Sequence, residues 1–229
     1  MILHIECIYF DIDGTLCDYG VHPRTVLRRV CAGLGIDATL DHHEYYDLYK
    51  VLAQERPDGS YEEISKDAYH RLLEKEGYGD ATLASRVAEA YRRIRLSSLR
   101  LYPETLAVLD SLSQRYRLGI ISNGPSEIQR EKMVKFRLVD YFDTVIISSE
   151  VGVEKPSATI FSHALQQAGA EAARSAHVGD SLSLDVKGAL EAGFTSFWIN
   201  RGVLDFDGVE VAPHYELQSL EELLPILDG

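Results

Sequence analysis

Short apolar segments alternate with helical segments after Pro103, and this alternation restricts the possible fold more than any other feature of the chain. The apolar segments predict strands over 117–122, 144–148, 175–178 and 195–199. The segments between them predict helices over 104–114, 126–136, 157–168 and 184–192, with a last helix over 217–227. Continuous apolar strands that alternate with helices favour a parallel sheet covered by helices on both faces, with right-handed crossovers. The sequence therefore predicts an α/β fold.

A further strand of the same sheet is predicted over 5–10, immediately before the sequence Asp11-Ile-Asp13-Gly14-Thr-Leu. Two carboxylates at the end of a buried strand repel each other and lose hydration, which costs free energy of folding. A bound cation would remove this cost, and Mg²⁺ prefers oxygen ligands from carboxylates and phosphate. Gly14 lets the backbone leave the strand abruptly and approach a ligand closely. The alternative interpretation is an acidic turn that binds nothing.

Residues 17–100 interrupt the alternation with helical patterns alone. Helices are predicted over 23–34, 42–55, 61–76 and 80–97, the third of them begun by a capping box of Ser60 and Glu63. Tyr45 and Tyr49 are one helical turn apart, and we expect this stripe to pack inside the helical module. The predicted domains are thus an α/β core of residues 1–16 and 101–229 and an inserted helical domain of residues 17–100.

Charged and hydroxyl side chains follow four of the predicted strands. In a parallel sheet the carboxyl ends of the strands meet at one edge, and ligands bind there. We therefore expect one site to contain Asp11, Asp13, Ser122, Asn123, Lys155, Asp180 and Asp185. His177, which lies inside a predicted strand, is expected to be a hydrogen-bonded core residue.

This set of side chains suits phosphoryl transfer, which needs positioning and neutralisation of negative charge. Asp11 and Asp180 could hold Mg²⁺ and leave coordination positions for water and a phosphate oxygen. The Ser122 hydroxyl, the backbone N–H groups near Asn123 and the Lys155 ammonium could donate hydrogen bonds to the other phosphate oxygens. One aspartate of the first pair could attack phosphorus while the other transfers protons.

Four motifs, in this order, resemble those of the haloacid dehalogenase (HAD) superfamily, in the phosphatase branch that has a helical cap after the first motif. The motifs are Asp11-Ile-Asp13-Gly-Thr-Leu, Ser122-Asn-Gly, Gly152-Val-Glu-Lys155-Pro156 and Gly179-Asp180-Ser-Leu-Ser-Leu-Asp185. The resemblance spans nearly the whole chain and implies a Rossmann-like catalytic core with residues 17–100 as the cap. Residues 152–161 and 192–200 are also similar to pyrimidine nucleotidase-like and N-acylneuraminate-phosphatase-like members of the superfamily.

The resemblance implies a role for each of these residues. Asp11 would be the nucleophile that forms a phosphoaspartate. Asp13 would protonate the leaving oxygen and then activate water, and its backbone carbonyl would bind Mg²⁺. True dehalogenases of the superfamily lack an aspartate at the position of Asp13, so its presence argues against dehalogenation.

The remaining motifs would complete the site. Ser122 and Lys155, with Asn123 beside them, would bind the phosphoryl group, and Asp180 would bind Mg²⁺. Asp185 would either meet the metal through water or orient Lys155. The function expected from these roles is Mg²⁺-dependent hydrolysis of a small phosphomonoester, such as a nucleotide or a sugar phosphate.

Three other functions are possible on this scaffold. A phosphonatase would need a Schiff-base lysine from the cap, and none of the cap lysines stands out in the sequence. A sugar-phosphate mutase would keep the same motifs, so it remains the alternative enzyme. A binding protein that has the phosphatase fold but has lost the activity is disfavoured, because every catalytic position expected from the resemblance is intact.

Composition restricts the partners and the compartment. The formal net charge is −13 and no cluster of Lys and Arg of the kind that follows a phosphate backbone is present, so we expect no nucleic acid polymer as a partner. The chain has no apolar run of about 18 residues, and its N-terminus lacks the basic region of a signal peptide, so no membrane association is expected. The three cysteines lack metal-ligand spacing and fit core residues of a cytoplasmic protein. The expected partner is a small phosphorylated metabolite, and the expected assembly is a monomer or a homodimer.

A second acidic sequence, Asp205-Phe-Asp207-Gly208, repeats part of the first motif. It follows no apolar strand and lacks the Thr-Leu continuation. We interpret it as an exposed acidic turn.

Overall fold

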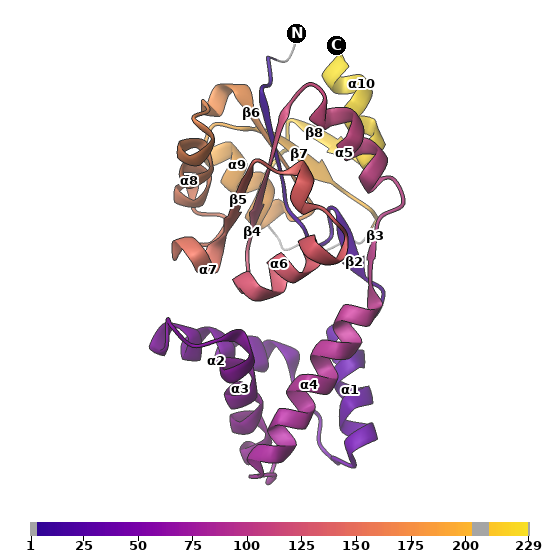
Figure 1. Ribbon diagram of the computed structural model, residues 1–229, viewed down its shortest axis with the longest axis vertical. Coiled ribbons are helices and arrows are strands. Elements are labelled where there is room, and N and C mark those ends of the chain that lie inside the picture. The colour runs from indigo at the N-terminus through magenta and orange to yellow at the C-terminus, as the bar shows by residue number, and fades with distance from the viewer. Residues whose placement is uncertain (1–3, 203–210, 229) are drawn as a thin grey trace. The chain divides into compact units, whose positions relative to one another are not determined.

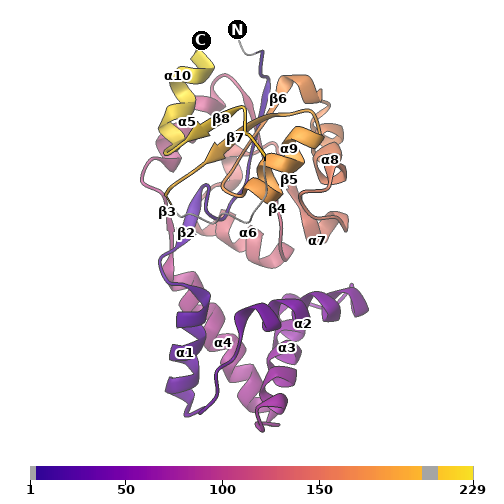
Figure 2. The same cartoon turned by 180° about the vertical axis from the view of Figure 1, so that it is seen from behind.

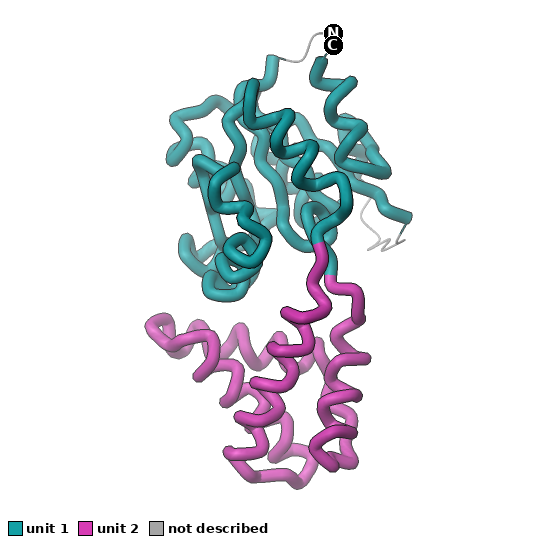
Figure 3. The backbone as a smooth tube through the Cα atoms, turned by 45° about the vertical axis from the view of Figure 1, so that its right-hand side comes forward, with its two compact units in different colours: residues 1–18, 101–229 teal, residues 19–100 magenta. Residues whose placement is uncertain are grey.

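The computed structural model describes residues 4–202 and 211–228, and the chain divides into two compact units (Figure 3). Unit 1 comprises Met1–Asp18 and Leu101–Gly229, and unit 2 comprises Tyr19–Arg100. Residues 17 and 18 fall in unit 1, not in the helical part, because the Cys17 carbonyl accepts a hydrogen bond from the Gly14 N–H (2.8 Å) and its side chain is buried. Asp205-Phe-Asp-Gly208 lies outside the described residues.

Unit 1 is built on a six-stranded sheet in which every strand pairing is parallel (Figure 1). The order across the sheet is β5-β4-β1-β6-β7-β8. The bounds are β1 Cys7–Phe10, β4 Arg117–Ser122, β5 Thr144–Ile147, β6 Ser175–Gly179, β7 Thr195–Ile199 and β8 Tyr215–Leu217. The predicted α/β fold is confirmed.

Alternate residues of the strands face opposite sides of the sheet, and helices cover both (Figures 1 and 2). Cys7 and Tyr9 of β1 pack with Phe161 of α8 (Ala158–Ala168) and with Ala189 of α9 (Lys187–Glu191) in one apolar cluster. The opposite side is covered by α5 (Thr105–Ser113) and α10 (Leu223–Asp228). Within the described residues no helix combines the length and apolar character needed to cross a membrane.

The prediction of one helix over 217–227 is wrong at its start. Tyr215–Leu217 forms the edge strand β8, and the Asn200 N–H donates to the Leu217 carbonyl (2.7 Å). A capping box of Ser219 and Glu222 then begins a 3-10 turn over Leu220–Glu222, which leads into α10. The sheet pairing therefore prevents a helix from starting at Leu217.

Unit 2 contains four helices around their own apolar core. Their bounds are α1 Pro23–Leu34, α2 His42–Glu55, α3 Tyr61–Lys75 and α4 Ala81–Ser98. The predicted capping box of Ser60 and Glu63 is present. Tyr45 and Tyr49 are buried, and the Tyr45 ring stacks on the Tyr69 ring with centroids 4.3 Å apart, so the prediction that this stripe packs inside the module is confirmed. The short strands β2 (Cys17–Tyr19) and β3 (Leu99–Leu101) pair where the chain enters and leaves the helices.

The core beneath the sheet gives a stability prediction. Phe161 is fully buried against the His177 and Phe194 rings, so we expect Phe161→Ala to lower the free energy of unfolding by about 3–5 kcal/mol. Urea denaturation followed by the fluorescence of Trp198, which lies in unit 1, measures this change. Val134→Ala, at a side chain that is 67% exposed, is the control. A loss below about 1 kcal/mol for Phe161→Ala would contradict this packing.

Candidate active site

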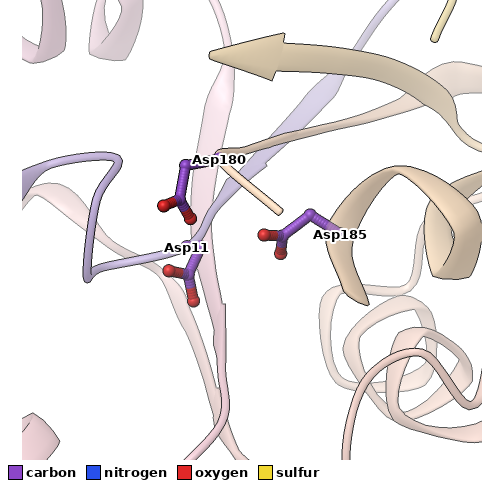
Figure 4. Close-up of side chains that lie close together, drawn as sticks. All are labelled: Asp11, Asp180 and Asp185. Carbon is purple, nitrogen blue, oxygen red and sulfur yellow. The ribbon is translucent and has the colours of Figure 1, made fainter. Parts of the chain in front are cut away.

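The residues predicted for the site lie together at the carboxyl edge of the sheet in unit 1. Asp11 follows β1, Ser122 is the last residue of β4, and Asp180 follows β6. Asp11, Asp180 and Asp185 each present a carboxylate oxygen within 4.8 Å of the others, and Figure 4 shows the three carboxylates gathered at one place. The parallel arrangement of the strands brings residues that are far apart in the chain to this edge.

Lys155 connects two of these carboxylates. Its ammonium nitrogen lies 2.6 Å from Asp11 Oδ1 and 2.6 Å from Asp185 Oδ1, and the residue is only 4% exposed. Burial alone would lower the pKa of Lys155, but the negative charges of Asp11 and Asp185 raise it. Lys155 is therefore a buried cation held between two anions.

Asp185 is held by three donors. Its Oδ1 accepts hydrogen bonds from Lys155 and from His177 Nε2 (2.8 Å), and its Oδ2 accepts from the Ser181 N–H (3.1 Å). A π-helical turn over Leu182–Val186 turns Asp185 inward. Burial opposes ionisation, but Lys155 and His177 lower the pKa of Asp185. The prediction that His177 is a hydrogen-bonded core residue is confirmed.

Two glycines make room for the carboxylates. A Cβ atom on Gly179 would lie 2.2 Å from the carboxyl carbon of Asp185. A Cβ atom on Gly14 would lie 1.9 Å from Asp180 Oδ2, and Gly14 has a φ of +76°, in the left-handed region. Any side chain at these two positions would displace an aspartate of the site.

The protein does not fully balance the negative charge of Asp11 and Asp180 in their ionised forms, and the pKa values of both are raised. Burial raises the pKa of Asp11 to about 6, against the lowering effect of Lys155. Loss of hydration at the Asp180 carboxylate, together with the charges of Asp185 and Asp11, raises the pKa of Asp180 to about 8. Oxygen ligands with unbalanced negative charge are the donor set that a hard divalent cation takes. Asp11 and Asp180 therefore fit a magnesium site, with Asp185 beside them.

Ser122 and Asn123 lie beside this acidic group. The Asn123 side chain is engaged with the backbone of Lys155, since Oδ1 accepts from the Lys155 N–H (2.8 Å) and Nδ2 donates to its carbonyl (3.1 Å). Ser122 Oγ lies 2.7 Å from Gln129 Nε2. Asn123 thus orients the backbone of Lys155 through its side chain.

Asp13 points toward α6 (Ser126–Lys135), where it contacts two residues that the sequence does not predict for the site. Lys132 Nζ lies 2.7 Å and 2.6 Å from the two carboxylate oxygens of Asp13, and Gln129 Nε2 lies 3.2 Å from one of them. Gln129 and Lys132 are both buried. Their predicted helix has no apolar stripe that would mark its inward face, so the sequence offered no clear signal for them.

Comparison with known families identifies the origin of this arrangement. The sequence profile of the haloacid dehalogenase-like hydrolases matches residues 5–193, which include every residue predicted for the site. The chain belongs to this family.

Two curated HAD relatives align over almost the entire chain. The glyceraldehyde 3-phosphate phosphatase of Methanothermobacter thermautotrophicus is 32% identical over 96% of this chain and 100% of its own length. The pyrimidine 5'-nucleotidase YjjG of Escherichia coli is 30% identical over 97% of each chain.

A solved structure agrees with this assignment. The HAD-hydrolase YfnB of Bacillus subtilis, solved bound to magnesium, has a TM-score of 0.71 and 26% identity, and the match covers 98% of this chain and 99% of that chain. The arrangement described above is therefore that of a HAD hydrolase.

The raised pKa values give a prediction for metal binding by this HAD hydrolase. Below about pH 8 Asp180 of the metal-free protein binds a proton, and below about pH 6 so does Asp11, so a cation must displace protons. We expect the apparent affinity for Mg²⁺ to fall as the pH falls, by roughly tenfold per pH unit for each proton displaced.

Trp198 offers a direct measurement, because it is the only tryptophan of the chain and its indole N–H donates to the Asp180 carbonyl (2.8 Å). Mg²⁺ titrations followed by Trp198 fluorescence between pH 6 and pH 9 test the expectation. Asp180→Asn is the control, and we expect it to weaken binding and flatten the pH dependence above pH 7. An affinity independent of pH in the unmodified protein would contradict the assignment.

Proposed function

We propose that this HAD hydrolase is a Mg²⁺-dependent phosphatase that hydrolyses a small phosphomonoester through a phosphoaspartate on Asp11. Asp180, Asp11 and the backbone carbonyl of Asp13 are the proposed metal ligands. Ser122, Lys155 and the backbone N–H of Asn123 are the proposed phosphate donors. The proposal includes the helical unit as the cap that selects the substrate.

The observation that carries the proposal is the Lys155 ammonium placed between Asp11 and Asp185, beside the acidic group. A carboxylate attacks a phosphate ester only if the mutual repulsion of the two anions is overcome. Lys155 supplies one positive charge at the nucleophile itself. Mg²⁺, when bound, would neutralise the acidic group and polarise a phosphoryl oxygen.

In the first step, a carboxylate oxygen of Asp11 forms a bond to phosphorus while the bond from phosphorus to the leaving oxygen breaks. Asp13, in its protonated form, gives its proton to the leaving oxygen, so the alcohol departs neutral. Lys155 holds the other Asp11 oxygen, which fixes the orientation of the nucleophile. The product of this step is the phosphoaspartate.

In the second step, a water molecule attacks the phosphorus atom of the phosphoaspartate, and the bond to the Asp11 oxygen breaks. The now ionised Asp13 takes a proton from this water, which restores its acid form for the next cycle. Inorganic phosphate leaves and Asp11 is regenerated as a carboxylate. The different contacts of the two aspartates support these different roles, because Asp11 contacts Lys155 and Asp13 contacts Lys132 and Gln129 of α6.

The relatives support a small substrate. The two named relatives act on glyceraldehyde 3-phosphate and on pyrimidine 5'-nucleotides, both of them phosphomonoesters. We propose the same chemical class for this chain. A panel of sugar phosphates and nucleotides assayed for phosphate release would identify the preferred member.

The nucleophile can be tested directly. We expect the unmodified protein with Mg²⁺ to release inorganic phosphate from an aryl phosphate, and Asp11→Asn to abolish release because an amide cannot form the acyl phosphate. A chelator should stop the reaction and added Mg²⁺ should restore it. Appreciable turnover by Asp11→Asn would refute the assignment, and transfer of phosphate between substrate positions with little release would instead indicate a mutase.

The acid–base residue gives a second test. Asp13→Ala should slow turnover by roughly 10²–10⁴-fold, because both steps lose their proton-transfer group. Rapid-quench measurement with a labelled phosphomonoester separates formation of the phosphoaspartate from its hydrolysis. If neither rate changed, Asp13 would have no part in the reaction.

A further inference from the structure

Helix α6 carries two polar side chains on a buried face. Gln129 is 2% exposed and Lys132 is 3% exposed, whereas Val134 on the same helix is 67% exposed. Residues three apart lie on one face of a helix, so Gln129 and Lys132 point to the same side. A lysine is rarely buried without a partner, because its charge loses hydration. The contacts of Gln129 and Lys132 must therefore explain why these polar side chains are buried where apolar side chains would normally lie.

Lys132 fixes the carboxylate of Asp13. Its ammonium lies at hydrogen-bond distance from both carboxylate oxygens, so rotation of the carboxylate would break at least one of the two contacts. The Asp13 side chain is 41% exposed, while that of Lys132 is 3% exposed. A side chain as exposed as that of Asp13 has room for several rotamers when no partner orients it. Lys132 therefore restricts the orientation of the Asp13 carboxylate.

Gln129 connects Asp13 to the neighbouring phosphate-binding residue. Its Nε2 atom lies 2.7 Å from Ser122 Oγ, 2.8 Å from the Asn123 carbonyl and 3.2 Å from Asp13 Oδ2. A hydroxyl that accepts a hydrogen bond still has its own hydrogen to donate. Gln129 thus leaves the Ser122 proton for a phosphate oxygen. One amide group sets the positions of a phosphate donor and of the acid–base carboxylate.

We propose that Gln129 and Lys132 are positioning residues for catalysis: Lys132 acts through Asp13, and Gln129 acts through Ser122 and Asp13. This inference rests on the proposed phosphatase function and adds two residues to it. Neither residue belongs to the four motifs of the resemblance. The competing interpretation is that both residues only stabilise the packing of α6.

The leaving group of the substrate separates these interpretations for Lys132. An alkoxide leaves only with a proton from an acid, whereas a nitrophenolate leaves well without one. If Lys132 positions Asp13, Lys132→Met slows hydrolysis of an alkyl phosphate more than that of p-nitrophenyl phosphate, by roughly 10- to 100-fold in the ratio of the two kcat/KM values. If the main effect of Lys132 were to oppose protonation of Asp13, the alkyl phosphate would be the less affected substrate.

A double-mutant cycle tests whether Lys132 acts through Asp13. We expect Lys132→Met to have little effect in the Asp13→Asn background, since the group that it positions is already inactive. The matched control is Lys135→Met, the same substitution at an exposed position of the same helix, and it should leave both substrates unaffected. Circular dichroism and the thermal midpoint of each variant verify that the fold is retained.

Gln129 is tested by inhibition. Gln129→Met should raise the inhibition constant of inorganic phosphate by roughly 3- to 10-fold, because Ser122 loses the group that orients it, and the effect should be absent in the Ser122→Ala background. This arm also decides the proposal if Lys132→Met does not fold. Inhibition unchanged by Gln129→Met would remove Gln129 from the proposal.

The experiments on Lys132 distinguish failure of its positioning role from failure of the phosphatase proposal. Equal slowing of both substrates, smaller slowing of the alkyl phosphate, or the same factor in the Asp13→Asn background would overturn its positioning role while leaving the phosphatase proposal intact. Absence of phosphate release by the unmodified protein with either substrate would overturn both proposals.

Discussion

Crowding of negative charge at one edge of the sheet is the constraint to which the rest of unit 1 responds. Asp11, Asp13, Asp180 and Asp185 converge where the strands end, and the described lysines in direct contact with them are Lys132 and Lys155. Such a group is costly to fold, because the buried carboxylates of Asp11 and Asp185 lose hydration and all four carboxylates repel one another. A divalent cation would offset the negative charge that the two lysines leave unbalanced when these carboxylates are ionised.

The positively charged groups lie closer to some of these carboxylates than to others, and the pKa values of Asp185, Asp180 and Asp11 differ as a result. Asp185 has Lys155 and His177 as donors, and its pKa is lowered. Asp180 lies among carboxylates, and its pKa is raised to about 8. Asp11 lies between these extremes, because burial raises its pKa to about 6 while Lys155 opposes the rise. The same residue type thus supplies a carboxylate in an ion pair, the proposed cation ligand and the proposed nucleophile, because a carboxylate takes its properties from its neighbours.

Most of the fold, and the proximity of the residues predicted for the site, could be predicted from the sequence for a simple reason. The apolar runs before Asp11, Ser122 and Asp180 mark strands, and the rule that parallel strands end at one edge then places these residues together. The same reasoning failed at residues 215–217, where leucines at helical spacing concealed an edge strand. It also failed for Gln129 and Lys132, since polar residues inside a helix normally indicate a solvated surface.

The sequence by itself determined the fold class, the strand ends and the identity of the acidic residues, because these follow from local periodicity and chain order. Only the tertiary structure decided which lysine meets which aspartate, that Asn123 holds the backbone of Lys155, and that α6 turns a buried polar face toward Asp13. Those pairings join residues as much as 144 positions apart. The free energy of each charged pair is the balance between the cost of desolvation and the Coulomb attraction of the two groups. Both depend on distances in the folded chain, which local sequence patterns do not specify.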